Sequence, residues 1–389
     1  MPFALWALAI GAFGIGTTEF IIAGLLPVIA TDFNVTIPVA GSLATSYALG
    51  VFVGAPALII FGSKVPRKAM LVFLMGLFVA GNLVTAFAPT LGMAILGRII
   101  TSMTHGAFFG IGSIIAADSV APSKRVRAIA FMFMGLTVAN LIGVPVGTWL
   151  GQHLSWRDAF IAIAVIGIIT VIGIALLIPH QPRPENHNFA DEFKAFRNVN
   201  VLLAMGITVF GPGAFFTSIT YIAPMMTELA GYRDSSLSWL MLLFGLGLFV
   251  GNQLGGRYAD RALMPMLYVT LAAQAMVLMV FNFTIHSQLM SAICIFLMAA
   301  FGFATVSPIQ KRVMDKARAA GAPTLAAAVN IGLFNLGNAV GAWLGGAVIA
   351  AGFGLQSPNW AGAVLSVIAL ILAVLSGLTD KTGQAVGQH

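Results

Sequence analysis

Residues 92–118 read GMAILGRIITSMTHGAFFGIGSIIAAD. The run is long enough to cross a bilayer as one helix, which takes about 20 apolar residues. It carries one charge inside, Arg98, and ends on a second, Asp118. Ionisable groups within a membrane are costly and are usually retained for function. The stretch therefore predicts a transmembrane helix with a functional side chain in it.

The whole chain has a similar composition. Of its 389 residues, 8% are charged and 59% are hydrophobic, whereas a soluble domain is about 25% charged. A water-soluble fold needs far more polar surface than this, so the composition excludes a cytosolic enzyme, a nucleic-acid-binding protein and a disordered chain. The single cysteine, Cys294, excludes an internal disulfide and a cysteine-cluster metal site.

Eleven further apolar segments resemble the first, so the sequence predicts an all-α membrane protein with twelve transmembrane helices. The expected spans are 4–26, 41–61, 69–88, 92–118, 127–150, 159–178, 201–225, 236–256, 264–283, 288–310, 323–350 and 359–378.

The basic residues predict the orientation of these spans. Of the 19 Lys and Arg residues, all but Arg98, Arg157 and Arg233 follow even-numbered spans. Cytoplasmic loops carry an excess of Lys and Arg, so we expect both termini in the cytoplasm. The same rule explains the net charge of +7 without a nucleic-acid partner.

The two halves of the chain repeat each other at a nearly constant offset. Gly50-Val51-Phe52-Val53-Gly54 matches Gly247-Leu248-Phe249-Val250-Gly251, and Gly147-Thr148-Trp149-Leu150-Gly151 matches Gly341-Ala342-Trp343-Leu344-Gly345. Six helices per unit is an even number, so both halves have the same orientation, as in transporters built from parallel repeats.

We therefore expect two pseudo-symmetric six-helix bundles. The bundles are residues 1–178 and 201–389, and the polar, proline-containing segment 179–200 is a cytoplasmic linker between them. In such a repeat the substrate site lies between the halves near the membrane midplane.

Glu19 in span 1 and Arg98 in span 4 are the two charges deep within spans. Glu19 lies about 22 Å from the start of its span and Arg98 about 9 Å from the other face, at 1.5 Å per residue. In a hydrocarbon core of about 30 Å these depths nearly coincide. An ion pair is possible, either as part of a transport site or as a static lock between the two helices.

Span 4 also places Ser102 and His105 on the face of Arg98, with Thr101 beside them. A polar face this deep is expected to line an aqueous cavity. Histidine and a cavity carboxylate can both exchange protons at physiological pH, so Glu19, Arg98 and His105 are the predicted proton-coupling residues. For His105 alone, a hydrogen bond within the bundle is an equally good interpretation.

Several amides recur in the spans, and Asn335 and Asn338 lie one turn apart. They serve either interhelical hydrogen bonding, which is common in membranes, or contact with a substrate. We take Asn335, Asn338, Ser102 and Thr101 as candidate cavity residues. Phe and Met side chains would suit an adaptable cavity for amphipathic compounds.

These features resemble the major facilitator superfamily, in particular the twelve-span drug:proton antiporter group and its arabinose-efflux-permease-like transporters of the bacterial inner membrane. Gly256-Arg257-Tyr258-Ala259-Asp260-Arg261 is similar to the family's 8–9 loop motif. The resemblance implies that Asp260, with Arg257 and Arg261, latches the cytoplasmic side through a helix dipole. The 2–3 loop has Ser63 in place of the aspartate but keeps Arg67 and Lys68.

The resemblance extends to spans 4 and 5. Arg98 matches the family's intramembrane arginine. Gly143-Val144-Pro145-Val146-Gly147 is similar to the antiporter motif, with one residue inserted between the glycine and Pro145. In the family this motif separates exporters from uptake symporters, so Gly143, Pro145 and Gly147 are expected to favour export.

The sequence thus predicts a proton-coupled efflux transporter for a small amphipathic compound, drug or sugar, in the inner membrane and complete as a monomer. Its partners are the substrate, protons and the lipid bilayer. No nucleotide-binding lysine motif or catalytic constellation is present, and no cofactor or metal is expected. Two alternatives stay open: a proton-coupled uptake symporter, and a membrane receptor or scaffold that does not transport.

Overall fold

A computed structural model of the chain describes residues 2–62, 65–179, 197–259, 261–319 and 323–386. Within these ranges all regular structure is helical, and 12 segments are long and apolar enough to cross a membrane. The predicted all-α fold with twelve spans is therefore confirmed.

The helices of the first half follow in chain order. They are α1 (Phe3–Asp32), α2 (Ile37–Ala40), α3 (Ser42–Gly62), α4 (Arg67–Ala86), α5 (Leu91–Asp118), η1 (Pro122–Lys124), α6 (Arg125–Val138), η2 (Ala139–Gly143), α7 (Val144–His153) and α8 (Trp156–Leu177).

The second half repeats this series. It contains α9 (Val199–Ile219), α10 (Ile222–Pro224), η4 (Met225–Leu229), η5 (Asp234–Ser236), α11 (Leu237–Ala259), α12 (Leu263–Thr284), α13 (Gln288–Ala304), α14 (Val306–Ala319), α15 (Pro323–Val348), η6 (Ile349–Phe353) and α16 (Ser357–Val386).

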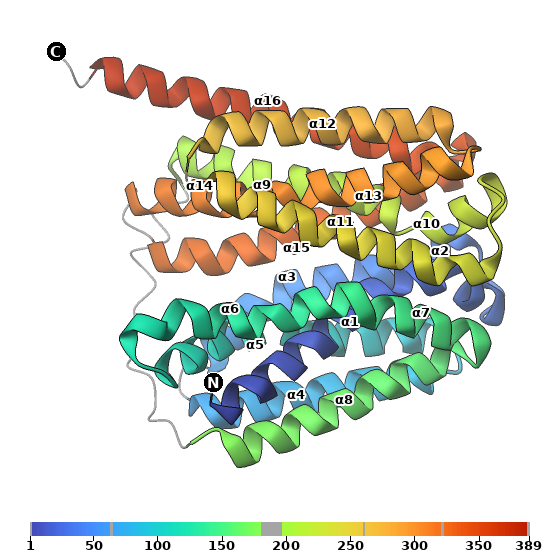
Figure 1. Cartoon of the computed structure of the whole chain (residues 1–389), viewed down its shortest axis with the longest axis horizontal. Helices are drawn as coiled ribbons and strands as arrows, with labels where there is room; N and C mark the ends of the chain where they lie inside the picture. The colour runs from blue at the N-terminus through green and yellow to red at the C-terminus, as the bar shows by residue number, and fades with distance from the viewer. Residues whose placement is uncertain (1, 63–64, 180–196, 260, 320–322, 387–389) are drawn as a thin grey trace.

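Figure 1 shows the helices as two groups, with blue to green α1–α8 mostly below and green to red α9–α16 above. Both chain ends lie towards the left of this view, where α6 and α15 begin. We call this the basic end, because Arg67, Arg125 and Arg257 lie at the helix ends there. The opposite end holds α2, α7 and α10.

The repeated glycines occupy equivalent places in the two halves. Gly50 and Gly54 pack α3 against Ser102 and Met103 of α5, while Gly247 and Gly251 pack α11 against the backbone of α13. Small residues allow helices to approach this closely in lipid, where no hydrophobic force drives them together. Spans 2 and 8 therefore meet spans 4 and 10 in the same way.

The second glycine repeat gives the same result for spans 5 and 11. Gly147 and Gly151 of α7 face α1, whereas Gly341 and Gly345 of α15 face α9. The sequence repeat is thus a repeat of packing, as a pseudo-symmetric pair of six-helix bundles requires.

The halves pack against each other along two flanks, where α3 lies along α15 and α11 packs against α7 and η2, and they also meet where α1 packs against α10. Between α11 and η2, Gly245 lies against the backbone carbonyl of Asn140 so closely that any Cβ at Gly245 would collide with it.

Three helices continue six or more residues past their predicted ends, among them α16, which ends at Val386 where 378 was expected. α1 continues through Pro27 to Asp32, because a membrane helix tolerates proline where neighbouring groups satisfy the freed backbone. The tenth span was expected to end at residue 310, yet α14 continues to Ala319. α14 carries Lys311, Arg312 and Lys316, and an apolar-run criterion misses such a polar helix.

Candidate functional site

A central cavity of about 190 Å³ lies between the two groups of helices, in the half of the molecule nearer the basic end. Its walls are mostly aromatic, with acidic, imidazole and amide groups among them. The lining residues are Glu19, Phe20, His105, Phe109, Phe133, Leu136, Phe303, Val306, Ile309, Gln310, Asn330, Ile331, Phe334 and Asn335. Both halves of the chain contribute, as expected for a site between repeats.

Glu19 is the carboxylate of this cavity. It is half-buried on α1, and none of the ion pairs among the described residues involves it. Its neighbour Phe20 also lines the cavity, whereas Thr18 is fully buried away from it. Glu19 therefore presents an unpaired acidic group to the space where a substrate or a proton would arrive.

Arg98 is fully buried and is bound by neutral groups. Its Nη1 donates to the carbonyl oxygen of Thr18 at 2.7 Å and to Oγ1 of Thr18 at 3.1 Å, and its Nε donates to the carbonyl of Leu43. No carboxylate of the described residues lies within 4.0 Å of its nitrogens. In this conformation a direct ion pair between Arg98 and Glu19 is therefore absent.

The α1 helix explains this outcome. Successive residues project about 100° apart around a helix, so Thr18 can face Arg98 while Glu19 faces the cavity. Thr18 also donates its hydroxyl to Asn82 of α4 at 2.9 Å. Arg98 and Asn82 together fix the turn of α1 from which Glu19 projects.

His105 is linked to Arg98 through Tyr47 of α3. The hydroxyl of Tyr47 lies 3.1 Å from Nδ1 of His105, and the guanidinium of Arg98 lies 4.2 Å from the centre of the Tyr47 ring. Tyr47 is buried, whereas His105 lines the cavity and also packs against Phe109. Arg98 and His105 of α5 are therefore connected by one aromatic side chain from α3.

The structure places the other polar residues of α5 in helix packing. Ser102 donates to the carbonyl of Ile99 and lies against Gly50, while Thr101 donates to Gly97 and lies against Gly81. Both are buried and neither lines the cavity.

The asparagines of α15 differ in whether their amide groups have hydrogen-bond partners. Asn335 lines the cavity, and its Oδ1 has no partner, although its Nδ2 donates to Ile331. Asn338 is fully buried outside the cavity, and neither of its polar atoms has a partner. Asn330 accepts from Thr208 and donates to Gln310, so it joins three helices of the second half.

The predicted gating residues lie at the basic end. Arg67 forms an ion pair of 3.2 Å with Asp118, which also approaches Arg125. Lys68 is half-buried at the start of α4. Arg257 and Arg261 are exposed at and after the end of α11. Asp260 lies outside the described residues.

The antiporter-like motif coincides with an irregular helix. Gly143 closes the π-helix η2 and touches Thr17, and Pro145 and Gly147 begin α7. A π-turn accommodates one residue more than an α-turn, and such turns are frequent at functional sites. The residue inserted before Pro145 is thus absorbed within the span, where α6 gives way to α7.

Aromatic side chains close the cavity towards the opposite end. Phe20 packs on Phe216 and Phe244, with ring centres 5.6 and 5.9 Å away. Further out, Tyr221 donates to the carbonyl of Ala342 at 2.8 Å and fills the space beside Gly41 of the first half. The two halves therefore meet at this end through large rings against a small residue.

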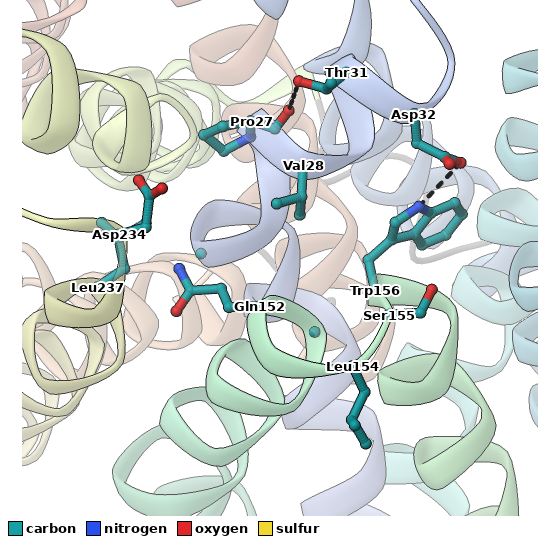
Figure 2. Close-up of a pocket in the computed structure, with 12 residues that line it drawn as sticks. Pro27, Val28, Thr31, Asp32, Gln152, Leu154, Ser155, Trp156, Asp234 and Leu237 are labelled. Carbon is teal, nitrogen blue, oxygen red and sulfur yellow. Dashed lines mark hydrogen bonds between the residues drawn. The ribbon is translucent and has the colours of Figure 1, made fainter.

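A second pocket, of about 500 Å³, lies at the opposite end. Figure 2 shows Trp156 donating to Asp32 on one side of Val28, and Gln152 and Asp234 on the other side. Asp32 also pairs with Arg157 at 3.0 Å. This pocket shares no residue with the central cavity.

Sequence reasoning missed several residues of the site. Tyr47 and Gln310 could have been suspected only because each places a polar group in or beside an apolar span. The phenylalanines that line the cavity cannot be distinguished by sequence from those that face lipid. Among the described residues, no group of three His, Cys, Asp or Glu side chains could hold a metal ion.

Comparison with known proteins identifies the family. Residues 8–333 match the Major Facilitator Superfamily. The chain is 43% identical over 374 residues to the inner membrane transport protein YdhP of Escherichia coli (strain K12), with 96% of each chain covered. It is 32% identical over 384 residues to a chloramphenicol resistance protein of Streptomyces lividans, again with 96% of each covered.

A solved structure shares the fold. A bacterial homologue of the human lysosomal transporter Spinster, in an inward-facing and unoccupied conformation, superposes with a TM-score of 0.76 at 17% identity, covering 97% of this chain and 96% of the other. With the family match, the twelve spans and the cavity between the halves, the chain belongs to the Major Facilitator Superfamily and is a secondary transporter of small molecules, not an enzyme.

Proposed function

We propose that this transporter is a proton-coupled exporter of small amphipathic compounds, located in a bacterial inner membrane with both termini in the cytoplasm. The similarity to a chloramphenicol resistance protein and to an inner membrane transport protein supports this assignment. So does the resemblance of residues 143–147 to the motif of drug:proton antiporters.

The unpaired carboxylate of Glu19 carries the proposal. It stands in an aromatic cavity, where it can bind either a proton or the polar group of a substrate. Competition between the two for one site is the simplest basis for antiport. Phe20, the residue after Glu19, packs against Phe216 and Phe244 of the second half. Protonation of Glu19 therefore takes place beside the aromatic contact that closes the opposite end.

Arg98 has a supporting role in this mechanism. Its guanidinium is bound to Thr18, the residue before Glu19 on α1, so it holds the position of Glu19. His105, tied to Tyr47, supplies a second proton-exchanging group in the cavity. Asn335 offers a free acceptor for a substrate donor.

Alternating access would then move the two bundles, residues 1–178 and 201–389, against each other about the cavity. The cavity lies nearer the basic end, which corresponds to an inward-facing state if the termini are cytoplasmic. Asp260 with Arg257 and Arg261, and Arg67 with Lys68, are proposed to close that end in the outward-facing state. Protonation of Glu19 biases the choice between the two states.

The test uses purified protein in liposomes and radiolabelled chloramphenicol. Two assays are compared: exchange of labelled for unlabelled compound without a pH gradient, and net movement driven by a pH gradient. Glu19→Gln is expected to retain exchange and to lose the gradient-driven movement. Glu228→Gln is the matched control, because Glu228 is an exposed acid in η4, away from the cavity and from the proposed gate.

Unchanged gradient-driven transport in Glu19→Gln would refute the proposed proton site. Movement of the compound in the same direction as the protons would establish uptake symport in place of export. Absence of any proton flux with chloramphenicol and with a panel of amphipathic compounds would overturn the assignment as an exporter of that class.

A further inference from the structure

A crevice of about 560 Å³ lies beside the central cavity, between α6 with η2 on one side and α11 on the other. It shares Phe133, Leu136, Phe303 and Val306 with the cavity. These side chains form a wall common to both spaces, so rotation of the shared rings would join the two into one passage.

The two flanks of the molecule differ at this level. On the far flank α3 packs closely along α15, and Gly332 meets Phe52 there. On the crevice flank, the contact of Gly245 with Asn140 holds α11 against η2, but α11 scarcely touches α6 beyond it. The halves therefore separate along α6 and α11 from Asn140 towards the basic end.

The crevice opens at membrane depth. Along α6, Phe133 lies about 9 Å and Asn140 about 20 Å from Arg127, the last basic residue at the start of that helix. One leaflet of hydrocarbon is about 15 Å thick. The outer wall is apolar and accessible, since Phe133, Met134 and Phe249 are each at least 40% exposed. At this depth, such an apolar wall is suited to contact with lipid acyl chains and not with water.

The inner end of the crevice carries a polar group without a partner. Asn140 lines the crevice and is only 4% exposed. Its Nδ2 donates to the carbonyl of Leu136 at 3.1 Å, but its Oδ1 accepts no hydrogen bond. A buried carbonyl oxygen left unpaired is unfavourable, so a ligand that supplies a hydroxyl or an N–H there gains affinity.

We propose that this crevice is a binding site and side entrance for membrane-dissolved amphipathic molecules that carry a hydrogen-bond donor. The apolar part lies against Phe133, Met134 and Phe249, and the donor bonds to Oδ1 of Asn140. From there the molecule passes Phe133 and Phe303 into the central cavity. Passage of the molecule into the central cavity rests on the proposed function, whereas its binding in the crevice does not.

The binding test compares two probes that differ by one donor, 2-naphthol and 2-methoxynaphthalene, on the protein in lipid nanodiscs without a pH gradient. Empty nanodiscs correct for partition into lipid. The expected result is a preference of about tenfold for 2-naphthol, the value of one hydrogen bond to a buried group, and loss of that preference in Asn140→Ala. Equal binding of the probes to the unaltered protein, or an unchanged preference in Asn140→Ala, would overturn the site.

A second variant tests the route without altering the interior. In a Cys294→Ser background, Met134→Cys is labelled with a bulky maleimide, and Val165→Cys on the exposed face of α8 is the labelled control. Label at Met134 is expected to slow the binding of 2-naphthol severalfold, whereas label at Val165 leaves the rate unchanged. Equal rates for the two would exclude entry through the crevice. Neither readout depends on proton coupling, so failure here and failure of the Glu19 proposal are separate results.

Discussion

The hydroxyl of Tyr47 lies 3.1 Å from Nδ1 of His105, while the ring of the same Tyr47 lies 4.2 Å from the guanidinium carbon of Arg98. Tyr47→Phe separates these two contacts, because it removes the hydroxyl and keeps the ring. We expect proton-driven transport to fall about threefold to tenfold, since one hydrogen bond is lost, and its dependence on pH to change. Thermal stability should stay near that of the unaltered protein.

Tyr47→Leu is the companion variant. It removes the ring as well, and a desolvated cation–π contact is worth about 2 kcal/mol, so this variant should also lose thermal stability. A purely structural role for Tyr47 predicts a different pattern, in which Tyr47→Phe shows the same transport rate and the same pH profile as the unaltered protein.

The equivalent glycines of the repeat provide a test of packing. A Cβ on Gly54 would meet the backbone of Met103, and a Cβ on Gly251 would meet the backbone of Ala300. Backbone cannot move aside as a flexible side chain can, so Gly54→Ala and Gly251→Ala should each cost about 1–3 kcal/mol of stability. Thermal unfolding in detergent measures this.

Gly76 in α4 is the control for that pair. Nothing lies within reach of a Cβ there, so Gly76→Ala should be neutral or gain up to about 1 kcal/mol from helix propensity. If Gly54→Ala and Gly251→Ala behave like Gly76→Ala, the close helix contacts of the repeat are not what stabilises the two halves.

Most of the fold follows from the sequence because a bilayer leaves few choices. Every buried backbone group must be satisfied, so an apolar run of the right length becomes a helix. Alternation of basic residues then predicts orientation. What the run length cannot predict is where a helix continues outside the apolar core, as α14 does, or how α1 passes Pro27.

The site was predictable only in part, for a geometric reason. Charge and depth single out Glu19 and Arg98, and the spacing along α5 brings His105 near them. Helix rotation is set by neighbours that sequence does not reveal: Thr18 and Tyr47 take up the guanidinium of Arg98, so Glu19 faces the cavity unpaired. Because helix rotation could not be predicted, Ser102 was expected to line the cavity, whereas its hydroxyl lies against Gly50.

The closed opposite end depends on a small residue at Gly41. A Cβ there would collide with the hydroxyl of Tyr221, which is held by its bond to Ala342. We expect Gly41→Ala to weaken closure by about 1–3 kcal/mol and so to favour the state open at that end. A cysteine at Asn335, in a Cys294→Ser background, should then react at least about fivefold faster with an impermeant maleimide added on that side.

Gly92, at the start of α5, is the matched control for Gly41. A Cβ at Gly92 meets nothing, so Gly92→Ala should leave labelling at the level of the background protein. Equal labelling rates in Gly41→Ala and Gly92→Ala would show that the Tyr221 contact does not hold this end closed.

Asn338 and Asn359 are both fully buried asparagines, but only one is paired. Asn359 accepts from Ser218 at 2.6 Å and contacts the sulfur of Met225, whereas neither polar atom of Asn338 has a partner. Replacing an unpaired buried amide by leucine, of similar shape, removes the unfavourable desolvation of that amide. Asn338→Leu should therefore raise stability by about 1 kcal/mol, and Asn359→Leu should lower it by about 1–3 kcal/mol.

A buried amide without a partner requires an explanation, and for Asn338 we propose that another state of the molecule uses it. We therefore expect Asn338→Leu to slow transport even as it raises the unfolding temperature, because Asn338 finds its partner, substrate or protein, once the halves move. Unfolding temperature and exchange rate are measured on the same preparation. A more stable variant that transports at the unaltered rate would show that Asn338 takes no part in the cycle, and a less stable one would show that its amide is paired within the bundle.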